Sequence, residues 1–313
     1  MRKLLSWTLK IGVTVGLLGY IFHLIPFAEV VDSVRSARLP LVALAFALGI
    51  LQIYVSAARL SVLLRRQGLV LSLHQIAEIN LVTAFYGFFM PSDLAAGAVR
   101  WHRLTRAGGK GAETFVSLAY GRLVFTSVLV AVGLAFLALE NPRALLEAQG
   151  VILGAILLLL VAVYVVGSLS RTHQLASGLK LWTWLAKLFE ATNRFRTIPL
   201  TSLTLVVAIS VAENLVGILS VYWLAVALAL PVTFVQIAWI RSLLMIVTLI
   251  PVSVSGLGVR EGGLVVLLAP YAVPQAGAVA LSFLLLGKIA FLASVGGISE
   301  VAKWLPARRS KHY

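Results

Sequence analysis

The sequence predicts an all-α protein that crosses a membrane several times, and three observations support this prediction. Apolar residues make up 60% of the chain, charged residues only 12%, and the mean hydropathy is +1.00. The apolar residues gather in runs of about 20, the length that a helix needs to cross the hydrocarbon core. Because backbone groups in lipid must bond within the chain, these runs are predicted to be helices. The 313 residues then form a single membrane domain, 1–313.

Eight hydrophobic segments follow one another along the chain. The first comes after a basic N-terminus and lacks a small-residue cleavage site, so we expect an uncleaved first span and no signal peptide. The segments are 11–28, 41–58, 75–99, 114–139, 150–170, 198–228, 233–260 and 264–298.

Two of these segments contain similar breaks, one in each half of the chain. Residues 91–100 read P-S-D-L-A-A-G-A-V-R, and residues 251–260 read P-V-S-V-S-G-L-G-V-R. Proline removes a backbone donor and disfavours helix at the preceding residue, so we expect the helices to break at Pro91 and Pro251. Two broken membrane segments at corresponding positions of two halves are typical of a transporter binding site.

The basic residues indicate on which side of the membrane the loops between the segments lie. If all eight crossed the membrane, the basic run 100–110 would lie opposite the loop assigned to Arg59, Arg65 and Arg66, although both are expected in the cytoplasm. The conflict disappears if 75–99 and 233–260 each enter and leave on one side, as re-entrant hairpins. Nineteen of the 26 Lys and Arg residues then fall in cytoplasmic segments.

The predicted fold is therefore six transmembrane helices plus two oppositely oriented re-entrant helical hairpins, with eight full crossings as the alternative. Three crossings in each half invert the second half relative to the first, which gives an inverted repeat of 1–140 and 150–300. The similar stretches G-R-L-V-F (121–125) and G-K-I-A-F (287–291) support the repeat. Both termini are expected in the cytoplasm of a cell with an inner membrane.

Segment 171–197 departs from the membrane pattern. It mixes tryptophan, leucine and phenylalanine with lysine and arginine. This composition predicts an amphipathic helix in the cytoplasmic interface that joins the two halves, and the alternative is a plain cytoplasmic linker.

Several function classes lack support in the sequence. The net charge of +15 follows from the cytoplasmic basic loops, so no nucleic-acid partner is expected. The chain has no cysteine, its five histidines show no metal-ligand spacing, and there is no P-loop or dinucleotide fingerprint. We therefore expect no enzyme activity, no cofactor and no metal.

Ionisable residues inside the apolar runs are the most informative polar residues. Each costs about 2.5–3.5 kcal/mol at membrane depth and usually faces a bundle interior or a cavity. Sixteen uncharged residues precede Glu213 and twenty-seven follow it. Glu213 therefore needs a partner, for which Arg241 and Lys288 are the candidates. A purely structural ion pair is the alternative interpretation.

The hairpin tips and the buried charges together predict a substrate site. A helix that starts at mid-membrane offers unpaired N–H groups to an anion, serine hydroxyls add donors, and the arginine fork suits phosphate. The alternative is that the small residues only allow close helix packing. The predicted substrate-binding residues are Arg100, Arg260, Glu261, Arg122, Arg241, Lys288, Glu213, Ser92, Asp93, Ser253, Ser255, Gly256 and Gly258.

Two stretches carry a family resemblance. I-P-V-S-V-S-G-L-G-V-R-E-G-G-L (250–264), followed by V-P-Q-A-G-A-V-A-L-S (273–282), resembles the transmembrane region of lysylphosphatidylglycerol synthases, a flippase-like membrane family. F-F-M-P-S-D-L-A-A-G-A-V-R (88–100) is similar to the family's other signature, although Asp93 and Ala96 replace part of a more glycine-rich run. The resemblance implies a polytopic inner-membrane protein that moves a lipid between leaflets. The chain ends soon after its last span, so the synthase activity itself is not expected.

The predicted function is a lipid translocase or scramblase without a nucleotide engine. Its substrate would be an anionic phospholipid or a polyprenyl-phosphate-linked lipid. Arg100 and Arg260 would gather the phosphate, and Glu213 would act as a counter-ion or couple protons. One alternative is a proton-coupled secondary transporter of a small anionic solute, and another is a membrane scaffold for a lipid-modifying enzyme. The expected partners are membrane lipids, with a second copy of the chain or such an enzyme left open.

Overall fold

The structure is a computed structural model that describes residues 25, 27–89, 93–141, 143, 199–248 and 258–309, with only the backbone for 93–95 and 303–309. Its regular elements in these ranges are helices, and no strand occurs among them. The predicted segments 150–170 and 171–197, and nearly all of 11–28, lie outside the described residues.

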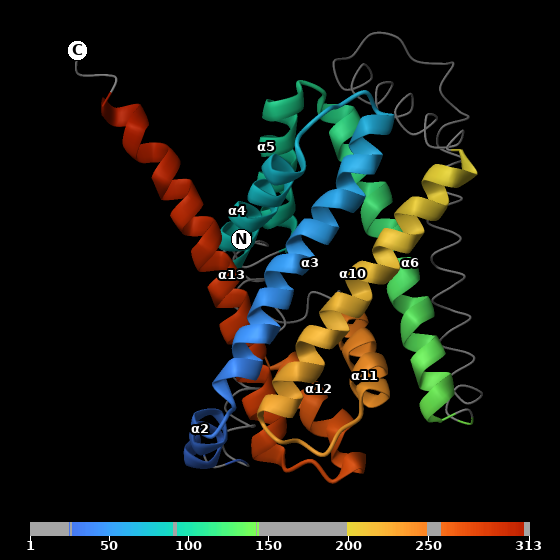
Figure 1. Cartoon of the computed structure of the whole chain (residues 1–313), viewed down its shortest axis with the longest axis vertical. Helices are drawn as coiled ribbons and strands as arrows, with labels where there is room; N and C mark the ends of the chain where they lie inside the picture. Colours follow the sequence, from blue (N-terminus) through green and yellow to red (C-terminus); the bar gives the residue numbers. More distant parts are fainter. Residues whose placement is uncertain are drawn as a thin grey trace, which may run out of the picture. The chain divides into compact units, whose positions relative to one another are not determined.

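The described helices differ strongly in length (Figure 1). Four of them are long and apolar enough to cross a membrane, namely α3, α6, α10 and the part of α13 up to residue 302. Together with the mean hydropathy of +1.00, this makes the chain a multi-pass membrane protein. The elements are α2 (Phe27–Arg35), α3 (Leu39–Arg66), α4 (Leu73–Phe89), α5 (Asp93–Gly108), α6 (Gly111–Glu140), α10 (Leu200–Ala227), α11 (Phe234–Val247), α12 (Val259–Leu268), η2 (Ala269–Tyr271) and α13 (Gln275–Arg309).

Two predicted boundaries were wrong. Helix α3 continues to Arg66, so Arg59 is a helical residue and not part of a loop. The segment 264–298 was expected to be one helix, but the chain forms α12, the single 3₁₀ turn η2 and then α13. The prolines explain this break, because Pro270 lies in the first turn of η2 and Pro274 directly precedes α13.

The succession of helices repeats. In each half a long helix is followed by two short helices and another long one: α3 to α6, then α10 to α13. Helix α3 begins at Leu39 and α10 at Leu200, and the separation along the chain is the same for α4 and α11, which begin at Leu73 and Phe234. For the other two pairs, α5 with α12 and α6 with α13, the separation along the chain is only slightly larger. The second series therefore contains only a few more residues than the first.

The first short helix of each series begins with the same cap. The hydroxyl of Ser72 accepts from the backbone N–H of Gln75, whose side-chain oxygen accepts from the N–H of Ser72, at 3.1 and 2.9 Å. Thr233 and Gln236 make the same two bonds at 3.3 and 2.9 Å. Such a capping box satisfies two free donors at a helix start. The two boxes have the same separation as the helices that they begin, so the repeat extends to individual side chains.

The chain divides into two compact units that cut across both series. Unit 1 contains 1–53, 80–99 and 215–313, and unit 2 contains 54–79 and 100–214. Helix α3 passes from unit 1 to unit 2 after Ile53, and α10 passes from unit 2 to unit 1 after Asn214. These two points have the same separation as the first residues of α3 and α10, so the repeated long helices are divided at equivalent positions.

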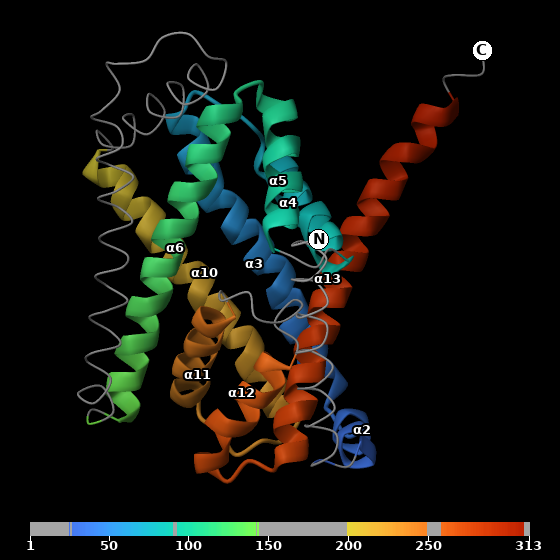
Figure 2. The ribbon, with the colours of Figure 1, turned by 180° about the vertical axis from the view of Figure 1, so that it is seen from behind.

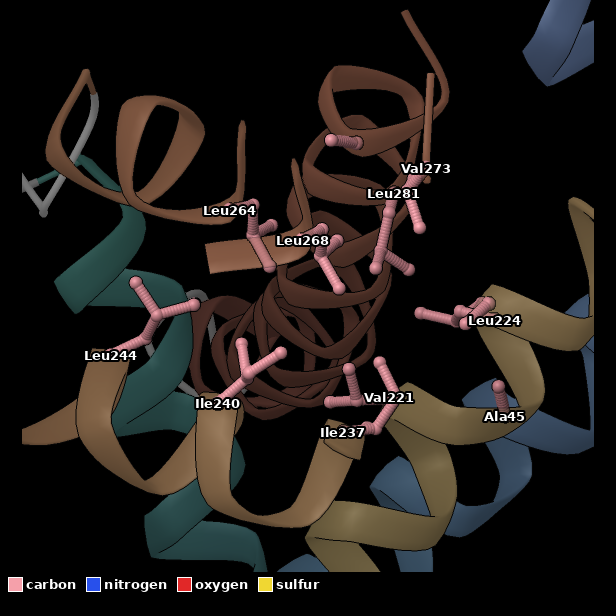
Figure 3. Packing of buried hydrophobic residues seen from close by; sticks show 12 residues of the cluster. Ala45, Val221, Leu224, Ile237, Ile240, Leu244, Leu264, Leu268, Val273 and Leu281 are labelled. Atoms are coloured by element: carbon pink, nitrogen blue, oxygen red, sulfur yellow. The ribbon is translucent and has the colours of Figure 1, made fainter. Parts of the chain in front are cut away.

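Unit 1 has a large apolar core. Ile237, Ile240 and Leu244 of α11 face Leu264 and Leu268 of α12, with side chains of α10 and α13 beside them (Figure 3). The views from both sides place α11, α12 and the start of α13 next to one another (Figures 1 and 2). Lipid tails are as apolar as these side chains, so the close fit stabilises the unit mainly through dispersion contacts.

The chain reverses between α4 and α5. A methyl group at Gly87 would lie 3.2 Å from the Cβ of Ala96. In a continuous helix these residues would be about 13 Å apart, at 1.5 Å per residue. Helices α4 and α5 therefore fold back on each other.

Glycine allows α13 to approach α4 closely. A methyl group at Gly296 would overlap the carbonyl oxygen of Leu81, and one at Gly297 would lie 2.7 Å from the ring of Phe85. Close backbone approach through small residues is typical of helix packing in membranes.

We predict that Gly296→Ala lowers the free energy of unfolding by about 1–3 kcal/mol, because the backbone of α4 must move to admit the methyl group. The matched control is Gly262→Ala in α12, where a methyl group would have no neighbour within 4 Å. The control should be neutral or stabilising, since alanine favours helix. Unfolding in detergent, followed by tryptophan fluorescence, compares the two; equal effects would contradict the close approach.

Candidate functional site

Polar contacts between α3 and α10 recur along one face of α3. Seven residues correspond to about two helical turns, so residues with this spacing face the same neighbouring helix. In unit 1, Ser220 of α10 donates to the carbonyl of Ala45 at 2.8 Å. In unit 2, Arg66 donates to Ser202. On α3, Ala45, Arg59 and Arg66 make such contacts. The amide of Gln52 lies beside Gly217 of α10, and each of these four α3 residues comes seven after the last.

The strongest of these contacts is an ion pair inside unit 2. Arg59 Nε lies 2.8 Å from Glu213 Oε2, and its Nη2 lies 3.5 Å from the other carboxylate oxygen. Arg59 Nη1 also donates to the carbonyl of Gly121, and the guanidinium lies 5.1 Å from the ring centre of Phe125. Both charged side chains are buried. Arg59 is therefore held from three sides at once.

This ion pair corrects the prediction for Glu213. The sequence suggested Arg241 or Lys288 as its partner, but the partner is Arg59, which the prediction had placed in a cytoplasmic loop. The prediction failed because α3 was ended at residue 58, one residue before the arginine. The alternative interpretation expected a buried ion pair at Glu213, and the structure contains one.

Two further cations, Arg100 and Arg122, lie near this pair in unit 2. Arg100 of α5 lies within electrostatic range of Arg59, Arg122 and Glu213. Its Nε is buried and has no hydrogen-bond partner among the residues that the structure describes. The unit 2 cluster, defined as Arg59, Arg100, Arg122 and Glu213, thus holds three cations and one carboxylate.

In unit 1, the start of α12 is built around a second carboxylate. Glu261 is 3% exposed, and its Oε2 accepts from the backbone N–H of Gly258 at 2.6 Å. Its Oε1 accepts from Arg260 Nη2 at 2.9 Å and from the hydroxyl of Ser282 at 2.6 Å. Arg260 Nε donates to the same hydroxyl at 2.9 Å. Gly258 has a φ of +83°, which glycine adopts without strain.

A buried lysine lies deeper in unit 1. Lys288 of α13 is 8% exposed and donates from Nζ to the hydroxyl of Ser220 at 2.9 Å. That hydroxyl in turn donates to the carbonyl of Ala45. Lys288 lies within electrostatic range of Arg241 and Arg260. The unit 1 cluster, defined as Arg241, Arg260, Lys288 and Glu261, again holds three cations and one carboxylate.

The structure brings together some of the predicted site residues. Arg260, Glu261 and Gly258 form one network, and Arg100, Arg122 and Glu213 belong to the unit 2 cluster. Asp93 is described only as the first residue of α5. The predicted residues outside the described ranges are Pro91, Ser92, Pro251, Ser253, Ser255 and Gly256.

Four residues of these networks were missed in the sequence: Gln52, Arg59, Ser220 and Ser282. The seven-residue spacing of Gln52, Arg59 and Arg66 within one apolar run could have indicated a shared helix face. Serines carry no such signal, because their hydroxyls commonly bond to their own helix backbone.

A family model describing the transmembrane region of lysylphosphatidylglycerol synthase matches residues 7–293 of the chain. The match includes every described residue of both charge clusters. A search of curated proteins finds no match.

We predict that Arg59→Met and Glu213→Leu each lower the free energy of unfolding by about 3–5 kcal/mol, because each leaves the other charge buried without its partner. The double variant should recover most of this loss, since neither charge then remains. A double-mutant cycle of unfolding in mixed micelles measures the coupling. Additive losses in the double variant would show that the pair is not energetically coupled.

Proposed function

The chain belongs to the family of the lysylphosphatidylglycerol synthase transmembrane region, and from this premise we propose that it moves an anionic lipid between the two leaflets of a membrane. The substrate class is a phospholipid or a polyprenyl-phosphate-linked lipid, both of which carry phosphate on a long apolar tail. No energy-yielding reaction is part of the proposal, so the protein acts as a translocase or scramblase and not as an enzyme.

One observation carries the proposal: in each compact unit one cation lies within electrostatic range of two others, and one of the three pairs with a carboxylate. A buried charge without a counter-ion costs several kcal/mol in an apolar environment. An anionic headgroup that enters either cluster would balance this excess and regain hydrogen bonds. Neutral lipids would gain much less, so the charge balance favours anionic ones.

The geometry of Arg260 suits a phosphate group. Two of its nitrogens are already directed by Ser282 and Glu261, which fixes the plane of the guanidinium. A planar fork held in place loses little conformational freedom when it binds a second oxyanion. Arg260 is therefore the proposed headgroup contact of unit 1, and Arg100 that of unit 2.

The proposed topology keeps the two re-entrant hairpins. The reversal between α4 and α5 and the contact of Gly263 in α12 with Leu244 in α11 support two helical hairpins. Re-entrant hairpins bring polar backbone to membrane depth only where it lines protein or a cavity. We propose that the hairpins enter from opposite faces of a cell inner membrane, with both termini in the cytoplasm.

We predict that Arg260→Ala slows the movement of fluorescent phosphatidylglycerol across proteoliposomes roughly 10- to 100-fold, the loss expected for a charge-assisted hydrogen bond. The control is Arg65→Ala, an exposed cation at the end of α3. Dithionite quenching of the outer leaflet gives the rate.

The same vesicles distinguish the proposal from its rivals. Wild-type protein that moves no anionic lipid would contradict a translocase. Uptake of a small anionic solute driven by a pH gradient, without lipid movement, would instead favour the secondary transporter.

A further inference from the structure

The internal repeat makes a direct comparison of the two charge clusters possible. When α3 and α10 are aligned from their first residues, Gln52 of α3 corresponds to Glu213 of α10, and Arg59 of α3 to Ser220 of α10. The similar stretches 121–125 and 287–291 relate α6 to α13, at a separation slightly larger than that of the first residues of these helices.

The contacts within each unit agree with this correspondence. In unit 2, Arg59 bonds to the carbonyl of Gly121 in α6. In unit 1, Ser220 bonds to Lys288, the residue after Gly287 in α13. Equivalent positions of α3 and α10 thus contact neighbouring positions of α6 and α13, which lie one residue apart in the alignment.

The two units differ in charge at the position that Glu213 occupies in unit 2. In unit 2 the α10 position is the carboxylate of Glu213, which binds Arg59. In unit 1 the equivalent position is the neutral amide of Gln52. A methyl group at Gly217 would lie 2.9 Å from Gln52 Nε2 and 2.8 Å from Arg241 Cζ, so the amide and the guanidinium face the same point of α10.

The side chain of Lys288, from α13, lies against the same part of α3 and α10. Ser220 lies one turn after Gly217 on α10, and the Lys288 side chain would lie 3.4 Å from a methyl group at Gly49, one turn before Gln52 on α3. No carboxylate pairs with Lys288 among the residues that the structure describes. A lysine, an arginine, a hydroxyl and an amide therefore converge where unit 2 has an internal carboxylate.

We propose that this place in unit 1, formed by Gln52, Ser220, Arg241 and Lys288, binds the phosphate oxyanion of the transported lipid, and that Glu213 occupies the equivalent place in unit 2 as an internal substitute for that anion. The inference rests on the proposed function and adds that residue 52 sets the charge of the unit 1 site. Gln52 keeps the unit 1 site open to an external anion because it is neutral. A carboxylate at residue 52 would close the site, as Glu213 closes its counterpart.

The test is Gln52→Glu in the purified full chain, reconstituted in phosphatidylcholine nanodiscs with increasing phosphatidylglycerol. A bound ligand raises the unfolding temperature by mass action, so the midpoint reports occupancy. We expect the phosphatidylglycerol fraction for a half-maximal rise to increase at least tenfold, because the new carboxylate competes for Arg241 and Lys288. The matched control is Gln275→Glu, an exposed first residue of α13 in the same unit, which should bind like the wild type.

Two further variants separate charge from folding. Gln52→Met, neutral and similar in length, should keep the half-maximal fraction within about threefold of the wild type, as expected for one lost neutral hydrogen bond. Lys288→Met should weaken phosphatidylglycerol binding, and this second test does not depend on whether Gln52→Glu folds correctly. Wild-type affinity in Gln52→Glu or in Lys288→Met, or equal losses in Gln52→Met and Gln52→Glu, would overturn the proposal.

A parallel titration with sodium phosphate in neutral detergent identifies the source of the anion. A rise that Gln52→Glu abolishes would make free phosphate a ligand of the same site, whereas a response to phosphatidylglycerol alone would restrict the site to lipid. If wild-type vesicles move lipid but Gln52→Glu binds it normally, this inference fails while the proposed function stands.

Discussion

The cost of holding charge away from water governs how this protein is built. Arg59 and Glu213 are both buried, and removing either one would leave the other charge buried without its partner, at a cost of about 3–5 kcal/mol. Their pairing joins α3 to α10, and the bond from Arg59 to Gly121 joins α6 to the same point. Other cations lie near Arg59 and near Arg260, and we propose that their positive charge attracts an anionic lipid headgroup.

The internal repeat explains why this charge is distributed over two clusters. Equivalent helices bring equivalent positions together in both units, so one arrangement of α3, α6 and α10 is found again with α10, α13 and α3. The side chains at these positions have diverged, however. One cluster keeps its own carboxylate against the arginine of α3, and the other has an amide there. Two related sites of unequal charge would give a lipid headgroup different affinities within one protein.

The sequence predicted the helical membrane class of the fold, for physical reasons that can be stated, whereas the substrate-binding residues stay a prediction. Long apolar runs are local signals, so the long helices could be expected, whereas Pro91 and Pro251 lie outside the described residues. Lone charges in such runs are equally conspicuous, as Glu213 was. Its partner could not be derived, because a pairing between residues so far apart in the chain depends on how helices pack. The break at Pro270 was missed since hydropathy alone does not reveal where an apolar run turns.

Solid-state NMR of the protein in phosphatidylglycerol membranes can show whether Lys288 binds lipid phosphate. With ¹⁵N-labelled lysine, dipolar dephasing by ³¹P reports direct contact between an ammonium group and a phosphate. If Lys288 binds the headgroup, a buried lysine signal that is absent from Lys288→Met will be strongly dephased. A Lys288 signal without dephasing in membranes saturated with phosphatidylglycerol would show that the lysine does not bind the lipid.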